Sequence, residues 1–159
     1  MPVLDDQTQE TVAFLRDPLL DADCGRILGF HVASPAGMLF LSAADILSIG
    51  TKVHVRSAVK LSPPDELVRL RTALDDERYF LGQTIRNRET GRALGTCGDL
   101  QFETNHFAVE WLFPRRWFFF GQPVPASDIL EVTKDAVWVK DPVRPVQERI
   151  ALVPDRAVS

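Results

Sequence analysis

The chain has 159 residues, of which 45% are hydrophobic and 25% are charged, a composition typical of a globular protein. Its net charge of −4 argues against a general nucleic-acid binder, which needs a basic surface to displace counterions, and against an electrostatic membrane anchor. No apolar run approaches the roughly 20 residues of a membrane span, and the acidic start Met1–Asp6 does not fit a signal peptide. Two lone cysteines, Cys24 and Cys97, do not make a disulfide framework, so we expect a cytoplasmic protein.

The first sixty residues read as short strands separated by turns. Apolar or alternating runs predict strands at 11–15, 26–32, 38–41 and 52–56. The first strand is expected to end at Asp17-Pro18, and the segments Asp21–Gly25 and Ser34–Gly37 are turn signals. Strands this short predict a small barrel or sandwich, since closure into a barrel removes exposed sheet edges.

The next segment predicts a short amphipathic helix over 63–74. Ser62 can cap such a helix, and Pro63 suits its first turn. The leucines that recur at helical spacing are Leu67, Leu70 and Leu74. We expect this leucine stripe to pack on one of the neighbouring barrels or on both.

The second half of the chain repeats the first. The aligned segments are Val3–Thr8 with Ile85–Thr90, Ala43–Ile49 with Ala126–Val132, and Val53–Arg56 with Val137–Lys140. Strands are predicted in this half at 107–112, 117–120 and 136–140. A repeat this long indicates two similar folding units. We therefore predict an all-β chain with two tandem small barrels joined by a short helix: a first module at 1–61, a helical linker at 62–80, a second module at 81–141 and a proline-containing tail at 142–159.

The repeated strings resemble the PRC-barrel family. Its pattern is a glycine-rich turn with Leu-Gly, then an aspartate, and finally a small residue with Asp-Ile-Leu before an alternating strand. The second copy carries these as Glu89–Gly95, Asp99, Ala126–Leu130 and Val137–Val139. The first copy carries Asp17 and Ala43–Leu47, but Gln9 stands where the first turn of the pattern has its glycine.

The resemblance implies small, mostly antiparallel barrels that serve as interaction modules. Such barrels occur in the cytoplasmic part of the H subunit of photosynthetic reaction centres and in the ribosome-maturation factor RimM, where the barrel region contacts a ribosomal protein. We therefore predict a non-enzymatic adaptor that mediates protein–protein interaction or assembly. The alternative is an RNA- or ribosome-associated assembly factor similar to the barrel part of RimM, although the N-terminal glycine-rich signature of RimM is missing.

Residues that could carry catalysis fit structural roles better. The histidines are His31, His54 and His106, and the aspartates that recur once in each copy are Asp17 with Asp99 and Asp45 with Asp128. An aspartate beside a turn usually accepts hydrogen bonds from nearby backbone, and one that recurs in each copy belongs to the module rather than to a unique site. A zinc site needs three or four converging ligands, and neither cysteine has such a spacing to a histidine. No nucleophile elbow, phosphate loop or dinucleotide fingerprint is present, so we expect no enzyme activity, cofactor, metal or small-molecule substrate.

The segment Phe107–Gly121 is the exception. It predicts a hairpin with Pro114–Arg116 at its tip and tryptophans on either side. Because strand alternation can send only half of Trp117–Phe120 inward, one or two large rings must face outward, unless they pack on the linker helix, the other barrel or the tail. Exposed aromatic rings beside arginine are typical of interface hot spots. The predicted partner-binding residues are Trp111, Arg115, Arg116, Trp117 and Phe119, and the predicted partner is another protein or a second copy.

Overall fold

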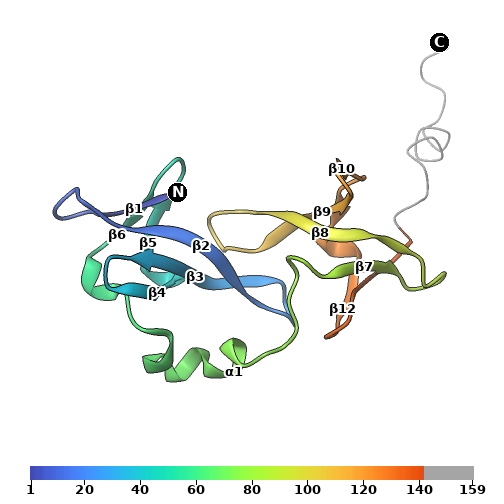
Figure 1. The fold of residues 1–159 in the computed structure, drawn as a ribbon, viewed down its shortest axis with the longest axis horizontal. Helices are drawn as coiled ribbons and strands as arrows, with labels where there is room; N and C mark the ends of the chain where they lie inside the picture. The colour runs from blue at the N-terminus through green and yellow to red at the C-terminus, as the bar shows by residue number, and fades with distance from the viewer. Residues whose placement is uncertain (142–159) are drawn as a thin grey trace, which may run out of the picture. The chain divides into compact units, whose positions relative to one another are not determined.

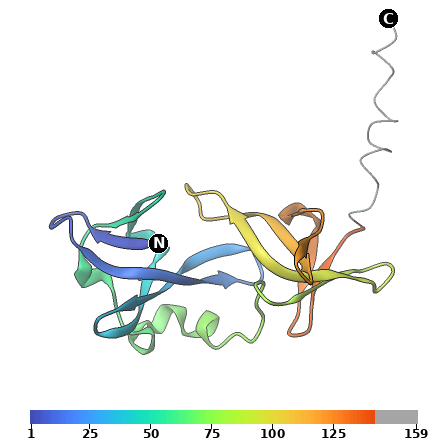
Figure 2. The same ribbon diagram turned by 45° about the horizontal axis from the view of Figure 1, so that its top comes forward.

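The structure is a computed structural model that describes residues 1–141, so the predicted tail at 142–159 lies outside the described residues. The chain is all-β, as predicted, with two curled sheets and short helical turns (Figures 1 and 2). It divides into two compact units. Unit 1 comprises Met1–Tyr79 with Gln101–Glu110, and unit 2 comprises Phe80–Leu100 with the chain from Trp111 onward.

The sheet of unit 1 has six strands in the order β4-β3-β2-β1-β6-β5. The strands are β1 (Pro2–Asp5), β2 (Thr11–Asp21), β3 (Arg26–Ser34), β4 (Gly37–Ser42), β5 (Ile46–Ile49) and β6 (Val53–Val55). Neighbours run antiparallel except β1 and β6, which run parallel. A 3-10 turn, η1 (Ala43–Asp45), joins β4 to β5. The largest fully buried side chains of this sheet are Val3, Val32, Phe40, Leu41, Val53 and Val55.

The sheet of unit 2 repeats this strand order. Its main path is β10-β9-β8-β7-β13-β12, with β11 pairing to β9 as well. The strands are β7 (Thr84–Asn87), β8 (Ala93–Phe102), β9 (Val109–Arg116), β10 (Phe119–Phe120), β11 (Val124–Pro125), β12 (Ile129–Val132) and β13 (Val137–Val139), with η5 (Ala126–Asp128) between β11 and β12. The largest fully buried side chains are Ile85, Leu112, Val124, Val137 and Val139, together with Phe80 before the first strand.

The strand registers agree with the sequence alignment residue by residue. In the one parallel pair of unit 1, Val3 lies opposite Val53. In the one parallel pair of unit 2, Ile85 lies opposite Val137. Aligned residues therefore occupy the same positions in the two sheets, which is what an internal repeat requires.

A buried polar side chain anchors the first turn of each copy. The carboxylate of Asp5 accepts hydrogen bonds from two backbone N–H groups of its turn, and the side-chain oxygen of Asn87 does the same in the second copy. The donors and N···O distances are Gln7 at 2.8 Å and Thr8 at 3.2 Å in the first copy, and Glu89 at 2.8 Å and Thr90 at 3.2 Å in the second. Each copy thus closes this turn with an Asx-type arrangement.

The two anchors differ in their remaining contact. The second oxygen of Asp5 accepts a hydrogen bond from the backbone N–H of Ala58 at 2.8 Å, whereas the amide nitrogen of Asn87 donates to Asp141 at 3.1 Å. The Ala58 N–H, opposed by partial burial and helped by the turn N–H groups, lowers the pKa of Asp5. One anchor is therefore an acceptor only, and the other is an acceptor and a donor.

The anchored turn ends in a left-handed residue in both copies. Gln9 has φ of 61° and Gly91 has φ of 69°. Glycine adopts this region without steric cost, whereas glutamine does not. The missing glycine noted in the sequence therefore places a strained residue in the first copy.

The distal end of the β8–β9 hairpin belongs to unit 1. The backbone N–H of Ile27 donates to the carbonyl of Phe107 at 2.8 Å, and that of Val109 donates to Gly25 at 2.9 Å. The ring of Phe30 lies 5.9 Å from Phe102 and 6.4 Å from Phe107, centroid to centroid. Unit 1 therefore completes its core with residues that follow the start of unit 2 in the chain.

The segment predicted as one helix over 63–74 is a series of short turns, drawn in green in Figure 1. These are η2 (Ala58–Lys60), η3 (Pro64–Glu66), η4 (Val68–Leu70) and the single α-helical turn α1 (Arg71–Leu74). Leu67 breaks the predicted helix because its φ of −92° and ψ of 74° lie outside the helical region. Ser62 does not cap it, since its backbone exchanges two hydrogen bonds with Phe40. No helix in residues 1–141 is long and apolar enough to cross a membrane.

The first predicted strand also needs a correction. It continues past Asp17-Pro18 as β2, because the register with β3 shifts between Leu15 and Pro18. Proline lacks a backbone N–H and is tolerated at such a bulge. The strand therefore bends at this point instead of ending.

Candidate functional site

The β9–β10 hairpin of unit 2 ends in a two-residue turn. Arg116 pairs with Phe119, so Trp117 and Phe118 form the turn. The predicted tip at Pro114–Arg116 is wrong, because these residues are the last of β9. Pro114 fits there because it is buried and its carbonyl accepts a hydrogen bond from the backbone N–H of Gly121 at 2.7 Å.

The four residues Trp117–Phe120, hereafter the aromatic tip, are all exposed to solvent. Their exposed fractions are 89% for Trp117, 92% for Phe118, 77% for Phe119 and 58% for Phe120. Strand alternation does not divide them into inner and outer faces, because the chain reverses between the first two. At about 200 Å² per ring, the exposed aromatic area is on the order of 600 Å². An exposed apolar area of this size is at the upper end of what a monomer carries and is often functional.

The aromatic tip also holds a strained residue. Trp117 has φ of 55° in the first position of the turn, where hairpins usually place glycine or asparagine. A bulky residue in this region costs about 1–2 kcal/mol. Packing does not compensate for the cost, because the ring is exposed. A strained, exposed tryptophan points to a function outside folding.

Trp111 lies on β9 at the position that Gly29 occupies on β3 of unit 1. The two correspond because Gly29 pairs with Ser42 and Trp111 pairs with Pro125, each just before the repeated 3-10 turn. A side chain on Gly29 would collide with the backbone carbonyl of Leu41 and with the buried ring of Phe40. Unit 2 instead carries the large side chain of Trp111 at this position, and that side chain is 39% exposed.

Two glycines of β8 hold the base of the hairpin close. A Cβ atom on Gly95 would lie 2.9 Å from the carbonyl oxygen of Arg115, and one on Gly98 would lie 3.2 Å from the ring of Phe120. A Cβ atom at Gly95 would clash with backbone, and one at Gly98 would force neighbouring side chains to shift, so β9 packs closely against β8 at the base of the aromatic tip. The tip therefore projects from a closely packed base.

The two arginines before the aromatic tip have different surroundings. The guanidinium of Arg116 donates to the backbone carbonyl of Ala93 at 3.0 Å. Within residues 1–141 the guanidinium of Arg115 makes no hydrogen bond or ion pair. Arg116 is thus held against β8, whereas Arg115 is available at the rim of the tip.

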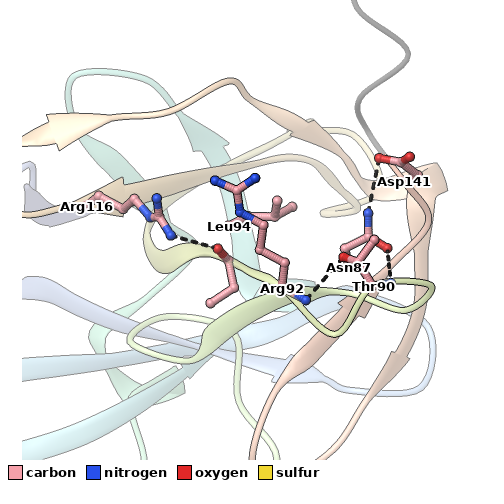
Figure 3. Close-up of a pocket in the computed structure, with 7 residues that line it drawn as sticks. Asn87, Thr90, Arg92, Leu94, Arg116 and Asp141 are labelled. Atoms are coloured by element: carbon pink, nitrogen blue, oxygen red, sulfur yellow. Dashed lines mark hydrogen bonds between the residues drawn. The ribbon is translucent and has the colours of Figure 1, made fainter.

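A pocket of about 320 Å³ lies beside the hairpin in unit 2. Figure 3 shows its lining residues, which are Asn87, Thr90, Arg92, Ala93, Leu94, Arg116 and Asp141. Arg116 is among the residues predicted from the sequence, whereas Arg92, Asn87 and Asp141 are not. The one available signal was the turn Glu89–Gly95, which places Arg92 directly before β8.

The other candidate residues do not come together. Nδ1 of His54 lies 3.7 Å from Oδ1 of Asp6, and Nδ1 of His106 lies 3.0 Å from Oε1 of Glu103 in an exposed turn. Burial raises the pKa of the Cys97 thiol to about 12, which keeps it protonated and unreactive near neutral pH. In the part of the chain that the structure describes, no three His, Cys, Asp or Glu side chains are arranged to hold a metal ion.

The repeated aspartates differ in their contacts. Asp17 and Asp99 hold equivalent places, because Ala13 pairs with Val3 and Gly95 pairs with Ile85. The carboxylate of Asp99 accepts a hydrogen bond from the N–H of Leu100 at 2.8 Å, and that of Asp17 accepts none from the described residues. Asp45 and Asp128 both close a 3-10 turn, η1 and η5, so their common role is local structure.

Neither a scan against protein-family models nor a search of curated proteins finds a match for this chain. The resemblance to the PRC-barrel family therefore stays a prediction from the sequence. The candidate features lie in unit 2: the exposed aromatic tip, the guanidinium of Arg115, which has no partner among residues 1–141, and the pocket that includes Arg116.

Proposed function

We propose that the chain is a non-enzymatic adaptor of the PRC-barrel type that binds another protein through its aromatic tip. The observation that carries this proposal is the exposure of four consecutive aromatic side chains, from 58% to 92%, on a hairpin whose base is closely packed. Tryptophan and arginine are the residues most enriched at binding hot spots. Arg115, next to the last residue of β9, supplies part of the surrounding rim, whereas Trp111 lies farther along β9 opposite Pro125 and is not part of the tip.

The size of the surface suits a protein partner. A standard interface buries about 800 Å² on each partner. The aromatic tip supplies on the order of 600 Å² of ring surface, estimated from about 200 Å² per ring, and Arg115 adds to it. A projecting tip of this kind is covered by a complementary apolar face of the partner.

A partner other than a second copy is favoured. In a symmetric dimer the same patch meets itself, so residues near the axis face their own copies. Arg115 and Arg116 directly precede the aromatic tip and would bring like charges together. A different protein with acidic groups around its apolar face avoids this repulsion.

The test compares two double variants of the full chain. In Trp117→Ala with Phe119→Ala, two exposed tip rings are removed. In the matched control, Phe14→Ala with Tyr79→Ala, two rings of unit 1 that are 53% and 52% exposed are removed. Each form is used to capture partners from extracts of the native host, and the captured protein is then produced separately and titrated by calorimetry.

The tip variant is expected to weaken association with the purified partner by well over tenfold, because removing a hot-spot aromatic typically costs ~2 kcal/mol or more. The control is expected to bind within twofold of the unmodified chain, and circular dichroism is expected to be the same for all three. A tip variant that melts earlier but binds normally would contradict the proposal. Tip-dependent capture of RNA that survives a high-salt wash would favour the RNA-associated alternative instead.

A further inference from the structure

We infer that the pocket beside the aromatic tip binds a single carboxylate of the partner, so the partner segment carries one acidic residue next to its apolar face. This inference rests on the proposed function and adds the chemistry that selects the partner. The pocket, of about 320 Å³, lies within the size range of binding sites for small groups. Two guanidinium groups line it.

Arg92 is the less constrained of the two arginines. Its backbone is fixed, since its N–H donates to the hydroxyl of Thr90 at 3.2 Å and its carbonyl accepts from Asn87 at 2.9 Å. Its exposed side chain makes no ion pair or hydrogen bond within residues 1–141. Figure 3 shows this side chain extending toward Arg116 and away from Asp141. A free guanidinium on a fixed backbone is suited to capture an anion.

Arg116 is already oriented. One of its N–H groups donates to the carbonyl of Ala93 at 3.0 Å, which leaves four of the five guanidinium donors for other acceptors. A planar guanidinium binds a carboxylate through two parallel hydrogen bonds, and such charge-assisted bonds are about twice as strong as neutral ones. With Arg92 nearby, the pocket supplies the donors that a carboxylate requires.

The opposite end of the pocket limits the charge of the ligand. Asp141 lines that end, and its carboxylate accepts a hydrogen bond from the amide of Asn87 at 3.1 Å. A second acidic group reaching this end would meet a like charge. The pocket is therefore expected to favour one carboxylate followed by neutral or donor groups over a dense run of acids.

The pocket and the aromatic tip are joined through one residue. Arg116 lines the pocket, pairs with Phe119 across the hairpin, and directly precedes Trp117. A partner segment whose apolar face covers the tip therefore has an adjacent site for its acidic side chain. The two features make a single surface with an apolar part and an anion-binding part.

The test is a selection from a phage-displayed library of random twelve-residue peptides on the full chain. Three immobilised forms are compared: the unmodified chain, Arg92→Glu, and the tip variant Trp117→Ala with Phe119→Ala. The unmodified chain is expected to enrich peptides with one Asp or Glu beside apolar residues. Arg92→Glu is expected to lose the acidic preference but to keep the apolar one, because charge reversal removes the anion site only.

The leading peptide is then synthesised and titrated by calorimetry. Arg92→Gln is expected to weaken its binding about tenfold, and replacement of its acidic residue by the amide is expected to have a smaller effect in that variant than in the unmodified chain, because Arg116 remains. The matched control is Arg69→Gln, which removes the same charge from an exposed arginine outside the pocket and should bind within twofold of the unmodified chain. Binding of the unmodified chain should also weaken more steeply with salt than that of Arg92→Gln.

The outcomes separate this inference from the proposed function. Selection that depends on the tip but shows no acidic preference would overturn the carboxylate site and leave the adaptor proposal intact. Acidic selection that survives loss of the tip rings would overturn the proposed tip. If phosphatidylcholine vesicles containing phosphatidylglycerol sediment the chain through both Arg92 and Trp117, and no peptide is selected, the anion is a lipid headgroup and both proposals fail.

Discussion

The β3–β4 hairpin of unit 1 and the β9–β10 hairpin of unit 2 occupy the same place in their sheets but end differently. The first turns through Pro35-Ala36 and continues into β4, where Phe40 and Leu41 are buried. The second turns through Trp117-Phe118, and its return strand β10 has two exposed residues before the chain rejoins the sheet at β11. The sheet positions are constrained by the core, whereas the tip is free to differ. Function in this repeat is therefore expected where the copies diverge.

The anchors of the first turn give a second comparison. Asp5 and Asn87 make the same two turn hydrogen bonds, but only Asp5 ionises. The copies are thus equal in geometry and unequal in chemistry. All three tryptophans, Trp111, Trp117 and Trp138, belong to unit 2. Tryptophan fluorescence therefore reports on unit 2, and circular dichroism reports on both units.

The largest effect is expected from exchanging the two anchors. In Asn87→Asp the new carboxylate faces Asp141 across a former hydrogen bond of 3.1 Å, so like charges replace a donor and its acceptor. We expect a loss of about 2 kcal/mol or more, measured as an earlier urea transition in tryptophan fluorescence. In Asp5→Asn, the equal exchange in unit 1, the amide places a donor against the N–H of Ala58 or gives up a turn bond. Asp5→Asn should move the urea transition seen by circular dichroism to lower urea concentration. If neither variant shifts its urea transition, the turns do not need their anchors.

A smaller effect is expected from acid. The pKa of Asp5 is lowered, chiefly by the N–H of Ala58, and that of Asp76 is lowered by hydrogen bonds from Arg78. A lowered pKa in the folded state means that the ionised form stabilises unit 1 above about pH 4 and that this stability is lost as the pH falls further. Asn87, the counterpart in unit 2, contributes no such dependence.

In a titration from pH 7 to pH 2, circular dichroism should therefore change before tryptophan fluorescence does. The control is Asp76→Asn. This variant should lower the stability of unit 1 at neutral pH, and it should also reduce how strongly that stability depends on pH below 4. Loss of tryptophan fluorescence before any change in circular dichroism would reverse the assignment of acid sensitivity to unit 1.

The smallest effect is expected at the left-handed turn residue. Gln9→Gly should stabilise unit 1 by about 0.5 kcal/mol, because glycine relieves the positive φ but gains freedom in the unfolded chain. Gly91→Gln should destabilise unit 2 by a similar amount, detected by urea unfolding followed by fluorescence. If both exchanges stabilise, or both destabilise, the unit that carries them, then the φ at this position does not distinguish the copies.

The fold was largely predictable from the repeat, because aligned strings such as Val3–Thr8 and Ile85–Thr90 occupy matching strands and turns. The helix over 63–74 was not, since leucine spacing carries no information about the backbone break at Leu67. The turn at Trp117-Phe118 was misplaced because four aromatic residues suit a strand and Pro114 suits a turn, yet Pro114 is buried in β9. Arg92 and Arg116 line one pocket because of how the strands pair, and residue spacing alone does not predict that pairing.

Residues 101–110 complete unit 1 although they follow the first strand of unit 2, and this has a consequence for synthesis on the ribosome. At roughly 5–20 residues per second, residues 80–110 take about 2 to 6 s to be added after Tyr79. During that interval Phe30 lacks the rings of Phe102 and Phe107, and the backbone of Gly25 and Ile27 lacks its partners. The first unit to be synthesised is therefore not the first to be finished, and a chain truncated at the linker would carry an incomplete core.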